Sequence, residues 1–547
     1  MKNGISKPDR IYKVAWIILA VAVFVLILGI RIRLLGIPLS RDEGEYAYAG
    51  QLMLQGVPPY KLAYNMKFPG TYAAYAMIMS IFGQTVTGIH VGLLLINAAT
   101  ITLIFFLGRR LLNWTAGLAA AASYAVLSVA PAVLGFAGHA EHFVMLPTLG
   151  GALLLFNQSD QQGFRRLFAS GLLFGLGLLM KQPAGFFVLF GAIYLVSKDV
   201  HCGFKLNRIL LRSSIFGAGV ILPLGITCLL LWYAGVFDKF WFWTVKYASQ
   251  YGSLVIGAVY YGKLSLSRVV ELFVHSIREV IGIGWMLWAL ALAGLGLLVG
   301  PWDKGSRTRT GFLLGLFVFS ALAVCLGFRF SSHYFILVLP AVSLLGGVAV
   351  SRASDLVASQ TRVVRFVPLV LFGAALSFLI FSEIKFFFGV SPVQACRMIY
   401  SGALFPESIR IAQYVRNHTS PDDTIAVLGS EPQIYFYSHR HSATGYIYTY
   451  GLMEPQKYAQ QMQQEMIHEI ELARPKYFIS VVTKSSWGRR RESDPIFTWA
   501  NEYTAENYAA IGLVNMETAD STYSYFREVP KSVPQGGDYI LIYERKS

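Results

Sequence analysis

Charged residues are scarce in this sequence. Only 14% of the 547 residues are Asp, Glu, Lys or Arg, whereas soluble globular chains carry about 25%. Hydrophobic residues make up 55%, and the mean hydropathy is +0.51. This composition excludes an ordinary soluble protein and predicts a protein of the lipid bilayer.

Cysteines and metal-ligand patterns are also sparse. The four cysteines are widely spaced, without a CxxC pair or a metal-binding spacing from histidine, which excludes a disulfide framework and a thiolate metal site. No aspartate cluster has metal-site spacing, so we expect no metal and no other cofactor. Internal repeats and low-complexity tracts are likewise absent from the sequence.

Basic residues outnumber acidic ones, and the formal net charge is +16. Nucleic acid is not the expected partner, because Lys and Arg fall mostly between apolar segments, as they do when they set membrane topology. The first apolar run follows a basic N-terminus, as in a signal peptide. No small-residue cleavage site follows it, and Arg31 and Arg33 end it. We therefore interpret this run as an uncleaved first span.

The apolar segments predict a polytopic α-helical membrane protein with about 11 transmembrane helices, since a spanning helix needs roughly 20 apolar residues. The two segments beside Lys181 are shorter, so residues 167–197 form either two short spans or one long tilted helix. The predicted segments are 12–36, 86–108, 114–135, 140–157, 167–181, 183–197, 213–235, 277–300, 311–328, 333–350 and 366–386.

The charges between the segments predict the orientation. With a cytoplasmic N-terminus, the inside connections hold clusters of Lys and Arg, while the outer turns GFAGHAE and RFSSH hold only Arg329. We predict a multi-pass protein of the cell inner (plasma) membrane whose C-terminal part lies outside the cytoplasm. The basic inside connections are 109–110, 165–166, 198–212, 304–309 and 352–365.

The composition changes after residue 387. ESIRIAQYVRNH has helical periodicity, and TIAVLG, KYFISVV and DYILIYER have the pattern of strands. We predict a transmembrane domain over 1–387 and an extracytoplasmic α/β domain over 388–547. One polar group in this domain is either an active-site cluster or a solvated loop: Glu431, Tyr435, Tyr437, His439 and Arg440.

Two predicted outer regions are longer than turns. The first outer loop, 37–85, contains two amphipathic stretches that we expect to form short interfacial helices on the membrane surface. The second long outer loop, 236–276, is rich in Trp, Tyr and Phe, which favour the membrane–water boundary.

Asp42 and Glu43 open the first interfacial helix. Acids at a helix start complement its dipole, and Ser40 can cap it, which is the simplest interpretation. The alternative is chemistry, because Lys67 lies in the same loop. A carboxylate can remove a proton from a hydroxyl, while a cation neutralises a departing phosphate. That combination favours glycosyl transfer from a polyprenyl-phosphate sugar.

Further ionisable residues lie in short outer turns that can converge on one cavity. A charged side chain near the outer membrane boundary is energetically costly and is usually functional. Lys181 either takes part in the site or extends to the membrane boundary. His139 and His142 flank Glu141 as metal ligands or as part of a solvated turn. Arg329 and His333 complete the group.

Four stretches resemble the GT-C glycosyltransferases, in the branch of the protein O-mannosyltransferases and the lipid A aminoarabinose transferase. They are RDEGEYAYAGQLMLQG, KFPGTYAAYA, MKQPAGFFVLF and HYFILVLPAVSLL. The resemblance covers roughly residues 10–350 in layout, and the acid pair is its most specific part. The C-terminal segment YVRNHTSPDDTIAVLGSEPQIYFYSHR resembles the domain appended to many bacterial members.

The resemblance implies an inverting transfer to an acceptor hydroxyl. Asp42 would be the general base, with Glu43 orienting the acceptor or supporting Asp42. Lys67 matches the basic residue that contacts the carrier phosphate, and Arg329 would be a second phosphate ligand, although its local motif departs from the family's better-known forms. The remaining substrate-binding candidates are Tyr46, Glu141, Lys181 and His333.

Two other classes compete with this interpretation. A transporter or flippase of a lipid-linked saccharide would show paired halves and charges near the bilayer midplane, but here the charges lie at one boundary. A binding or assembly protein would need only one anchoring helix for its external domain. The expected partners are a polyprenyl-phosphate-linked sugar donor, a lipid, glycan or protein acceptor, and the bilayer. The sugar, hexosyl or pentosyl, is not specified by the sequence.

Overall fold

The structure is a computed structural model that describes residues 7–156, 163–250, 266–298, 304–488, 494–518, 521–525 and 538–546. Residues 251–265 of the second predicted outer loop therefore lie outside the described residues. The contacts divide the chain into two compact units. Unit 1 consists of Met1–Leu35, His90–Thr227 and Leu264–Val390, and unit 2 of Gly36–Ile89, Cys228–Lys263 and Ser391–Ser547.

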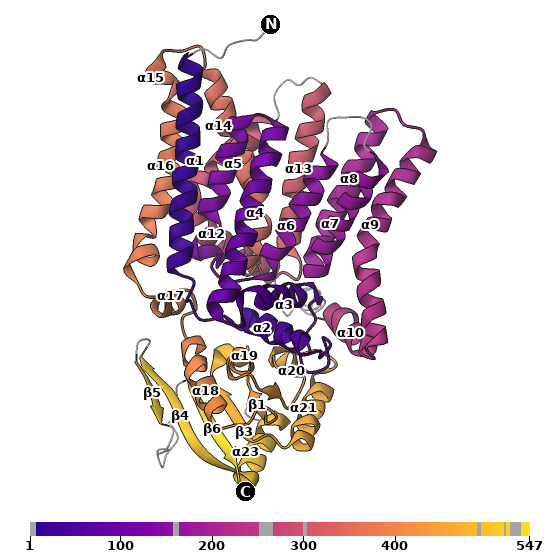
Figure 1. The fold of residues 1–547 in the computed structure, drawn as a ribbon, viewed down its shortest axis with the longest axis vertical. Helices are drawn as coiled ribbons and strands as arrows, with labels where there is room; N and C mark the ends of the chain where they lie inside the picture. Colours follow the sequence, from indigo (N-terminus) through magenta and orange to yellow (C-terminus); the bar gives the residue numbers. More distant parts are fainter. Residues whose placement is uncertain are drawn as a thin grey trace. The chain divides into compact units, whose positions relative to one another are not determined.

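Unit 1 is a bundle of helices that run side by side (Figure 1). A helix forms at each of the eleven predicted segments. Within the part of the chain that the structure describes, seven helices are long and apolar enough to cross a membrane. The shorter helices include two apolar ones, α5 and α6. The eleven helices are α1 (Lys7–Arg33), α4 (Val86–Leu111), α5 (Trp114–Leu127), α6 (Ala140–Leu155), α7 (Phe164–Met180), α8 (Gly185–His201), α9 (Leu206–Tyr233), α12 (Leu266–Leu297), α13 (Lys304–Cys325), α14 (Leu339–Leu356) and α16 (Val367–Ser382).

Short helices connect several of these elements. The 3-10 helices are η1 (Pro131–Val133), η2 (Gln182–Ala184) and η4 (Ser332–Leu337). Helix α15 (Arg362–Arg365) precedes α16, and the π-helical turn η5 (Lys385–Gly389) follows it.

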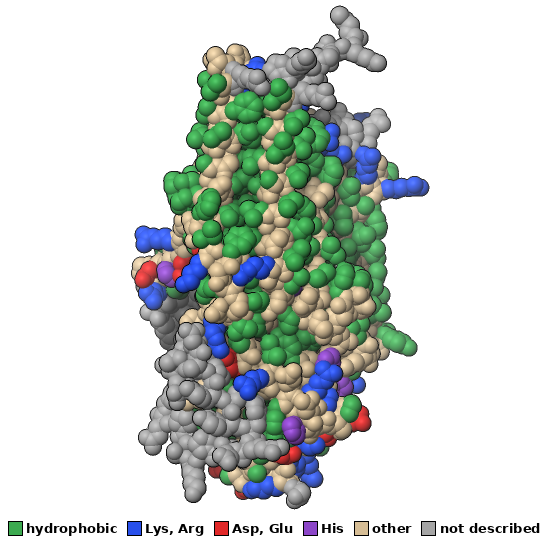
Figure 2. Space-filling view, turned by 60° about the vertical axis from the view of Figure 1, so that its left-hand side comes forward, with side chains coloured by type: hydrophobic (Ala, Val, Ile, Leu, Met, Phe, Trp, Pro, Cys, Tyr) green, Lys and Arg blue, Asp and Glu red, His purple; other side chains and the backbone are tan. Residues whose placement is uncertain are grey.

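The outer surface of the bundle is apolar, as a lipid-facing surface must be. Val21, Ile221 and Val370 are 55%, 68% and 64% exposed. Hydrophobic side chains cover most of the helical surface visible in Figure 2. Such extensive exposed apolar area is rare on soluble monomers and is typical of membrane contact. The multi-pass membrane class predicted from composition is confirmed.

Residues 167–197 form two helices, α7 and α8. Lys181 adopts an extended conformation, with φ −160° and ψ 140°, and ends α7. Pro183 follows in η2, and it disfavours a continuous α-helix because its ring fixes φ and removes the N–H donor. The break therefore has a local cause, and it leaves Lys181 between the two helices.

Glycine allows two of the closest helix contacts in the bundle. A Cβ on Gly171 of α7 would lie 2.1 Å from the carbonyl oxygen of Phe216 in α9, and one on Gly294 of α12 would lie 1.9 Å from that of Leu345 in α14. Because only glycine leaves room for backbone at this distance, small residues stabilise helix packing inside a membrane.

Unit 2 contains a six-stranded mixed sheet with the order β2-β1-β3-β6-β4-β5. Strand β1 is parallel to β2 and β3, and β6 is antiparallel to β3 and β4. The three predicted strand segments correspond to β1, β3 and β6. The strands are β1 (Thr424–Leu428), β2 (His441–Ser442), β3 (Tyr477–Val482), β4 (Tyr508–Thr518), β5 (Ser521–Tyr525) and β6 (Tyr539–Arg545).

The helices of unit 2 come from three separate segments of the chain. The two helices predicted in the first outer loop are α2 (Arg41–Leu54) and α3 (Gly70–Phe82). The others are α10 (Phe237–Trp241), the π-helical η3 (Phe242–Tyr247), α17 (Pro392–Ile399), α18 (Phe405–Asn417), α19 (Gln433–Ser438), α20 (Tyr450–Met453), α21 (Ala459–Ala473), α22 (Lys484–Trp487) and α23 (Pro495–Asn507).

The first outer loop groups with the C-terminal region, whereas the prediction assigned it to the transmembrane domain. Helix α2 packs closely on α19: a Cβ on Gly44 would lie 2.6 Å from the backbone nitrogen of Gln433. The Tyr48 hydroxyl accepts a hydrogen bond from the Ser442 N–H at 2.8 Å. These contacts join segments almost 400 residues apart, so no local sequence pattern predicts them.

Candidate active site

The start of α2 is fixed by a capping box between Ser40 and Glu43. The Glu43 carboxylate accepts hydrogen bonds from the Ser40 N–H and hydroxyl, both at 3.0 Å, and the Ser40 hydroxyl accepts one from the Glu43 N–H at 3.4 Å. A reciprocal pair of this kind satisfies donors that the first turn leaves open. Glu43 therefore has a local structural role, and its predicted role toward an acceptor stays a prediction.

Capping sets the face that α2 presents. Residues three and four apart share a helix face, so Asp42, Glu45 and Tyr46 point the same way. Lys67 lies against this face: its Nζ is 3.0 Å from Asp42 Oδ1, 2.9 Å from Glu45 Oε2 and 4.5 Å from the centre of the Tyr46 ring. One cation thus contacts two carboxylates and an aromatic ring.

Two tyrosines complete this cluster. The Tyr72 hydroxyl of α3 donates a hydrogen bond to Glu45 Oε1 at 2.7 Å, and the Tyr60 hydroxyl donates one to the Lys67 carbonyl oxygen at 2.7 Å. Asp42 is the most accessible charged member, with its side chain 20% exposed against 1% for Glu45. Asp42 is therefore the carboxylate that an incoming molecule can reach.

Burial and neighbouring charge act in opposite directions in this cluster. Burial alone would lower the pKa of Lys67, but the carboxylates of Asp42 and Glu45 raise this pKa well above its ordinary value. Burial raises the pKa of Glu45; Lys67 partly offsets this effect, whereas Asp42 adds to it. Lys67 is therefore cationic at neutral pH, and Glu45 is the carboxyl that burial makes more basic.

Arg41, which precedes Asp42, is held by the C-terminal region of unit 2. Its guanidinium donates hydrogen bonds to the Ser430 carbonyl at 2.5 Å, the Tyr450 hydroxyl at 2.7 Å and Glu431 Oε1 at 3.1 Å. The Ser486 hydroxyl donates one to Glu431 Oε2 at 2.6 Å. A planar guanidinium bound on several sides fixes the backbone beside Asp42.

Most of the polar group predicted as either an active-site cluster or a solvated loop is buried. Glu431, Tyr435 and Arg440 are buried, and Tyr437 and His439 are half-buried. Glu431 is 1% exposed and bound to Arg41, and the Tyr435 hydroxyl accepts from the Val427 N–H at 2.8 Å. The Tyr437 hydroxyl accepts from the Leu39 N–H at 3.0 Å. His439 Nδ1 lies 2.8 Å from the Gln51 amide, and Arg440 donates to Thr419. The solvated-loop interpretation is therefore wrong.

Unit 1 contains a second cluster, where α6 begins and α7 ends. Lys181 Nζ lies 2.5 Å from Glu141 Oε1 and 4.3 Å from the centre of the Tyr334 ring. The His139 and His333 rings stack with their centres 4.1 Å apart and an interplanar angle of 9°. Two of the predicted substrate-binding residues, Glu141 and Lys181, are thus joined, and His333 lies against His139.

The turn around Glu141 is not solvated. Glu141 is 0% exposed, His139 3% and His142 1%, so the interpretation as a polar turn in solvent is wrong. The packing of α6 against α7 and η4 covers it. Among the described residues, Glu141 Oε2 is a buried oxygen with no hydrogen-bond partner. Lys181 is 8% exposed and ion-paired, which also argues against simple extension to the membrane boundary.

Arg329 belongs to unit 1. It is exposed and follows α13, between Phe328 and Phe330, which have positive φ values of 54° and 48°. Its role as a second phosphate ligand stays a prediction.

Sequence reasoning missed Glu45, Tyr72 and Arg41. The position of Glu45 beside Asp42 could have been predicted from the sequence, because a spacing of three residues places both on one helix face. The roles of Tyr72 and Arg41 could not have been predicted, since they depend on contacts with other elements.

The buried Lys181–Glu141 pair predicts a coupled effect on stability. Lys181→Met leaves Glu141 buried without its cation, and such single losses cost about 3–5 kcal/mol. The double variant Lys181→Met/Glu141→Gln should regain much of that loss. Thermal unfolding of the purified variants in one detergent measures both. Additive losses in the double variant would contradict the coupling.

Comparisons with known proteins agree with this architecture. A family model described as dolichyl-phosphate-mannose-protein mannosyltransferase matches residues 67–232. No curated protein matches this sequence. The structure is similar to ArnT from Cupriavidus metallidurans bound to undecaprenyl phosphate, with 15% identity, coverage of 96% of this chain and 98% of that chain, and a TM-score of 0.55.

The archaeal oligosaccharyltransferase AglB from Archaeoglobus fulgidus, in complex with an inhibitory peptide and a dolichol-phosphate, is also similar. The identity is 12%, the coverage is 96% of this chain and 75% of that chain, and the TM-score is 0.50. The fold is therefore that of the GT-C superfamily of membrane glycosyltransferases. The matched family model covers less than half of the chain.

Proposed function

We propose that this protein is an inverting glycosyltransferase that moves a sugar from a polyprenyl-phosphate carrier to an acceptor hydroxyl at the extracytoplasmic membrane face. The observation that carries the proposal is the position of Lys67 between Asp42 and Glu45 at the start of α2. This cluster combines a reachable carboxylate with a cation that stays charged at neutral pH.

The chemistry follows from these charges. Asp42 removes the proton of the acceptor hydroxyl, and the oxygen attacks the anomeric carbon from the face opposite the phosphate. The bond from that carbon to the phosphate oxygen breaks, and the electron pair leaves with the polyprenyl phosphate. The attack inverts the anomeric configuration. Lys67 stabilises the negative charge that grows on the departing phosphate.

Lys67 would exchange partners during this step. In the structure its ammonium group contacts two carboxylates, so one cation faces two acids. A phosphate that takes over one of these contacts frees Asp42 to accept a proton. Tyr46 would support the ammonium group through its ring, and Glu43 would keep the helix start in place for the acceptor.

The cluster of unit 1, taken by itself, carries groups that suit parts of such a substrate. Glu141 Oε2, a buried acceptor without a hydrogen-bond partner among the described residues, suits a sugar or acceptor hydroxyl. Lys181 and Arg329 suit the carrier phosphate because both are cationic, and His333 suits a polar group of the substrate.

The similar structures support the choice of donor. One of them contains undecaprenyl phosphate and another a dolichol-phosphate, and both carriers are polyprenyl phosphates. The acceptor is a lipid, a glycan or a protein, and the sugar is a hexose or a pentose. The positive-inside pattern favours a protein of the inner membrane with the N-terminus cytoplasmic and residues 388–547 extracytoplasmic.

A binding and turnover experiment tests the function. Purified full-length protein is titrated with polyprenyl phosphate, and proteoliposomes are supplied with polyprenyl-phosphate sugars and membrane-derived acceptors. We expect saturable binding of the carrier and release of free polyprenyl phosphate as sugar is transferred. Movement of intact donor across the bilayer without bond cleavage would instead identify a flippase. No binding of the carrier would overturn the proposal.

The raised pKa of Glu45 predicts that carrier binding depends on pH. This raised pKa means that Glu45 keeps a proton at a higher pH than an ordinary carboxyl. As the pH rises through this pKa, the site gains a negative charge and the affinity for an anionic phosphate falls. Glu45→Gln should remove this component and tighten binding on the alkaline side by about tenfold, or about 1.4 kcal/mol.

Wild type and Glu45→Gln are titrated with the carrier between about pH 5 and pH 9. Both titrations contain the second ionisation of the phosphate itself, near pH 6. The difference between the two curves therefore isolates Glu45. Parallel curves would show that Glu45 does not titrate in contact with the carrier.

A further inference from the structure

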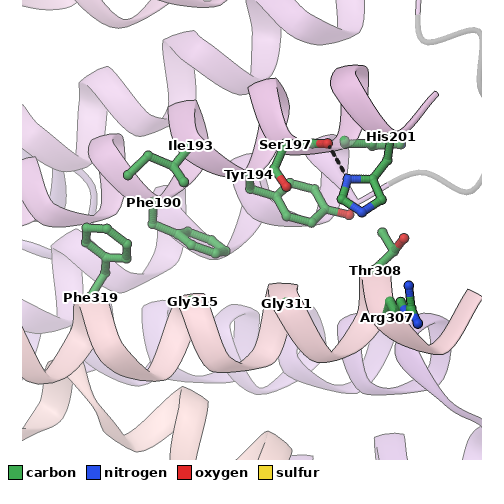
Figure 3. A pocket seen from close by; sticks show the side chains of 11 residues that line it. Phe190, Ile193, Tyr194, Ser197, His201, Arg307, Thr308, Gly311, Gly315 and Phe319 are labelled. Carbon is green, nitrogen blue, oxygen red and sulfur yellow. Dashed lines mark hydrogen bonds between the residues drawn. The ribbon is translucent and has the colours of Figure 1, made fainter. Parts of the chain in front are cut away.

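A second candidate binding site lies in unit 1 between α8 and α13, at the ends of these helices remote from Lys181. It is a cavity of about 140 Å³. Figure 3 shows side chains from both helices around it, and the proposed reaction uses none of them. The lining residues are Phe190, Ile193, Tyr194, Ser197, Lys198, His201, Arg307, Thr308, Gly311, Gly315 and Phe319.

The lining changes from apolar to polar along the cavity. Along α8 the lining residues change from the apolar Phe190 to the polar Lys198 and His201. Along α13 they change in the opposite direction, from Arg307 to Phe319. Phe190 lies 6.3 Å from Phe319 between ring centres, so the apolar ends of the two helices coincide. Figure 3 shows His201 and Arg307 together at the other end.

Gly315 lets the Phe190 ring lie directly against the backbone of α13 in the apolar part of the cavity. A Cβ at this position would lie 3.0 Å from two carbon atoms of the Phe190 ring. The Phe190 side chain therefore forms a wall directly against the backbone of α13. The wall suits a hydrocarbon chain, because it offers contact without a polar partner.

The polar end is basic. It presents Lys198, Arg307 and the ring of His201, whose Nδ1 lies 2.9 Å from the Ser197 carbonyl oxygen. The neighbouring acid, Asp199, does not cancel this charge, because its carboxylate is paired with Arg212 at 2.7 Å. The Thr308 hydroxyl adds a hydrogen-bonding group to this end.

We infer that this cavity binds an anionic glycerophospholipid, with its phosphate at Lys198 and Arg307 and the start of an acyl chain against Phe190 and Phe319. The charge gradient matches a molecule that is anionic at one end and apolar at the other. Basic pockets between transmembrane helices at the cytoplasmic boundary bind such headgroups. The basic connections of unit 1 predict that this end faces the cytoplasm.

The test uses the full-length protein in a neutral detergent. Native mass spectrometry measures binding of phosphatidylglycerol, of phosphatidylcholine with the same acyl chains, and of inorganic phosphate. We expect phosphatidylglycerol to bind at least about tenfold more tightly than phosphatidylcholine. The variant Lys198→Gln/Arg307→Gln should lose about 30-fold in phosphatidylglycerol affinity, because each basic residue near an anionic lipid contributes about fivefold.

A matched control removes the same charge outside the cavity. Lys205→Gln/Arg208→Gln changes two exposed residues, Lys205 between α8 and α9 and Arg208 in the first turn of α9. It should leave phosphatidylglycerol binding within about twofold. Equal binding of the two lipids, or equal losses in the two double variants, would overturn the inference. Inorganic phosphate that competes as well as the lipid would assign an ion site instead and would also overturn it.

Discussion

Asp42→Asn is expected to lower sugar transfer by about 10²- to 10⁴-fold, the contribution of a general base in a well-positioned site. Asparagine has nearly the same shape but cannot accept the acceptor's proton. The capping box at the helix start does not involve Asp42, so the helix should be retained. Lys67 still contacts Glu45, and donor binding should therefore change little.

Turnover and carrier affinity of the purified Asp42→Asn variant separate these effects. Asp238→Asn is a suitable control, because Asp238 is an exposed aspartate of α10 in the same unit. Near-normal turnover of Asp42→Asn would remove Asp42 from the mechanism. A parallel loss of carrier binding and turnover would assign it to binding instead of proton transfer.

Lys67→Ala is expected to weaken binding of the carrier phosphate by about 10- to 100-fold, because a charge-assisted hydrogen bond contributes about 1.5–3 kcal/mol. The substitution also leaves Asp42 and Glu45 facing each other without their shared cation. Two neighbouring carboxylates repel an anion, and this repulsion adds to the loss. The effect should be larger at alkaline pH, where Glu45 is ionised.

Titration of Lys67→Ala with polyprenyl phosphate measures this loss, and Lys61→Ala provides the comparison. Lys61 is exposed in the same loop and carries the same charge. Equal affinities in wild type and Lys67→Ala would show that the cluster does not bind the carrier and only stabilises the start of α2. Equal losses in both variants would reflect net charge alone.

Much of the fold followed from local patterns. The eleven apolar segments each form a helix, because twenty or so apolar residues in a membrane satisfy their backbone groups only within the helix itself. The break at Lys181 follows from Pro183, and the helix start at Arg41 from Ser40 and Glu43. Three of the six described strands, β1, β3 and β6, also followed from a local pattern, because each is a short apolar run.

The candidate site was readable only in part. Asp42 and Lys67 stood out because charges are rare in the outer loop. The sequence alone assigned the second carboxylate to Glu43, but adjacent residues point to different helix faces, and the structure pairs Lys67 with Asp42 and Glu45. The direction of a side chain depends on helix phase, which requires the exact helix start.

By itself the sequence determined the membrane class, the helical segments and the acid-rich start of α2, since hydropathy, caps and proline act over a few residues. Only the tertiary structure decided that Arg41 binds Glu431, 390 residues away, and that Glu141 pairs with Lys181, 40 residues away. Such contacts form because buried charges must find a partner, and the packing of the whole chain determines which partner is within reach.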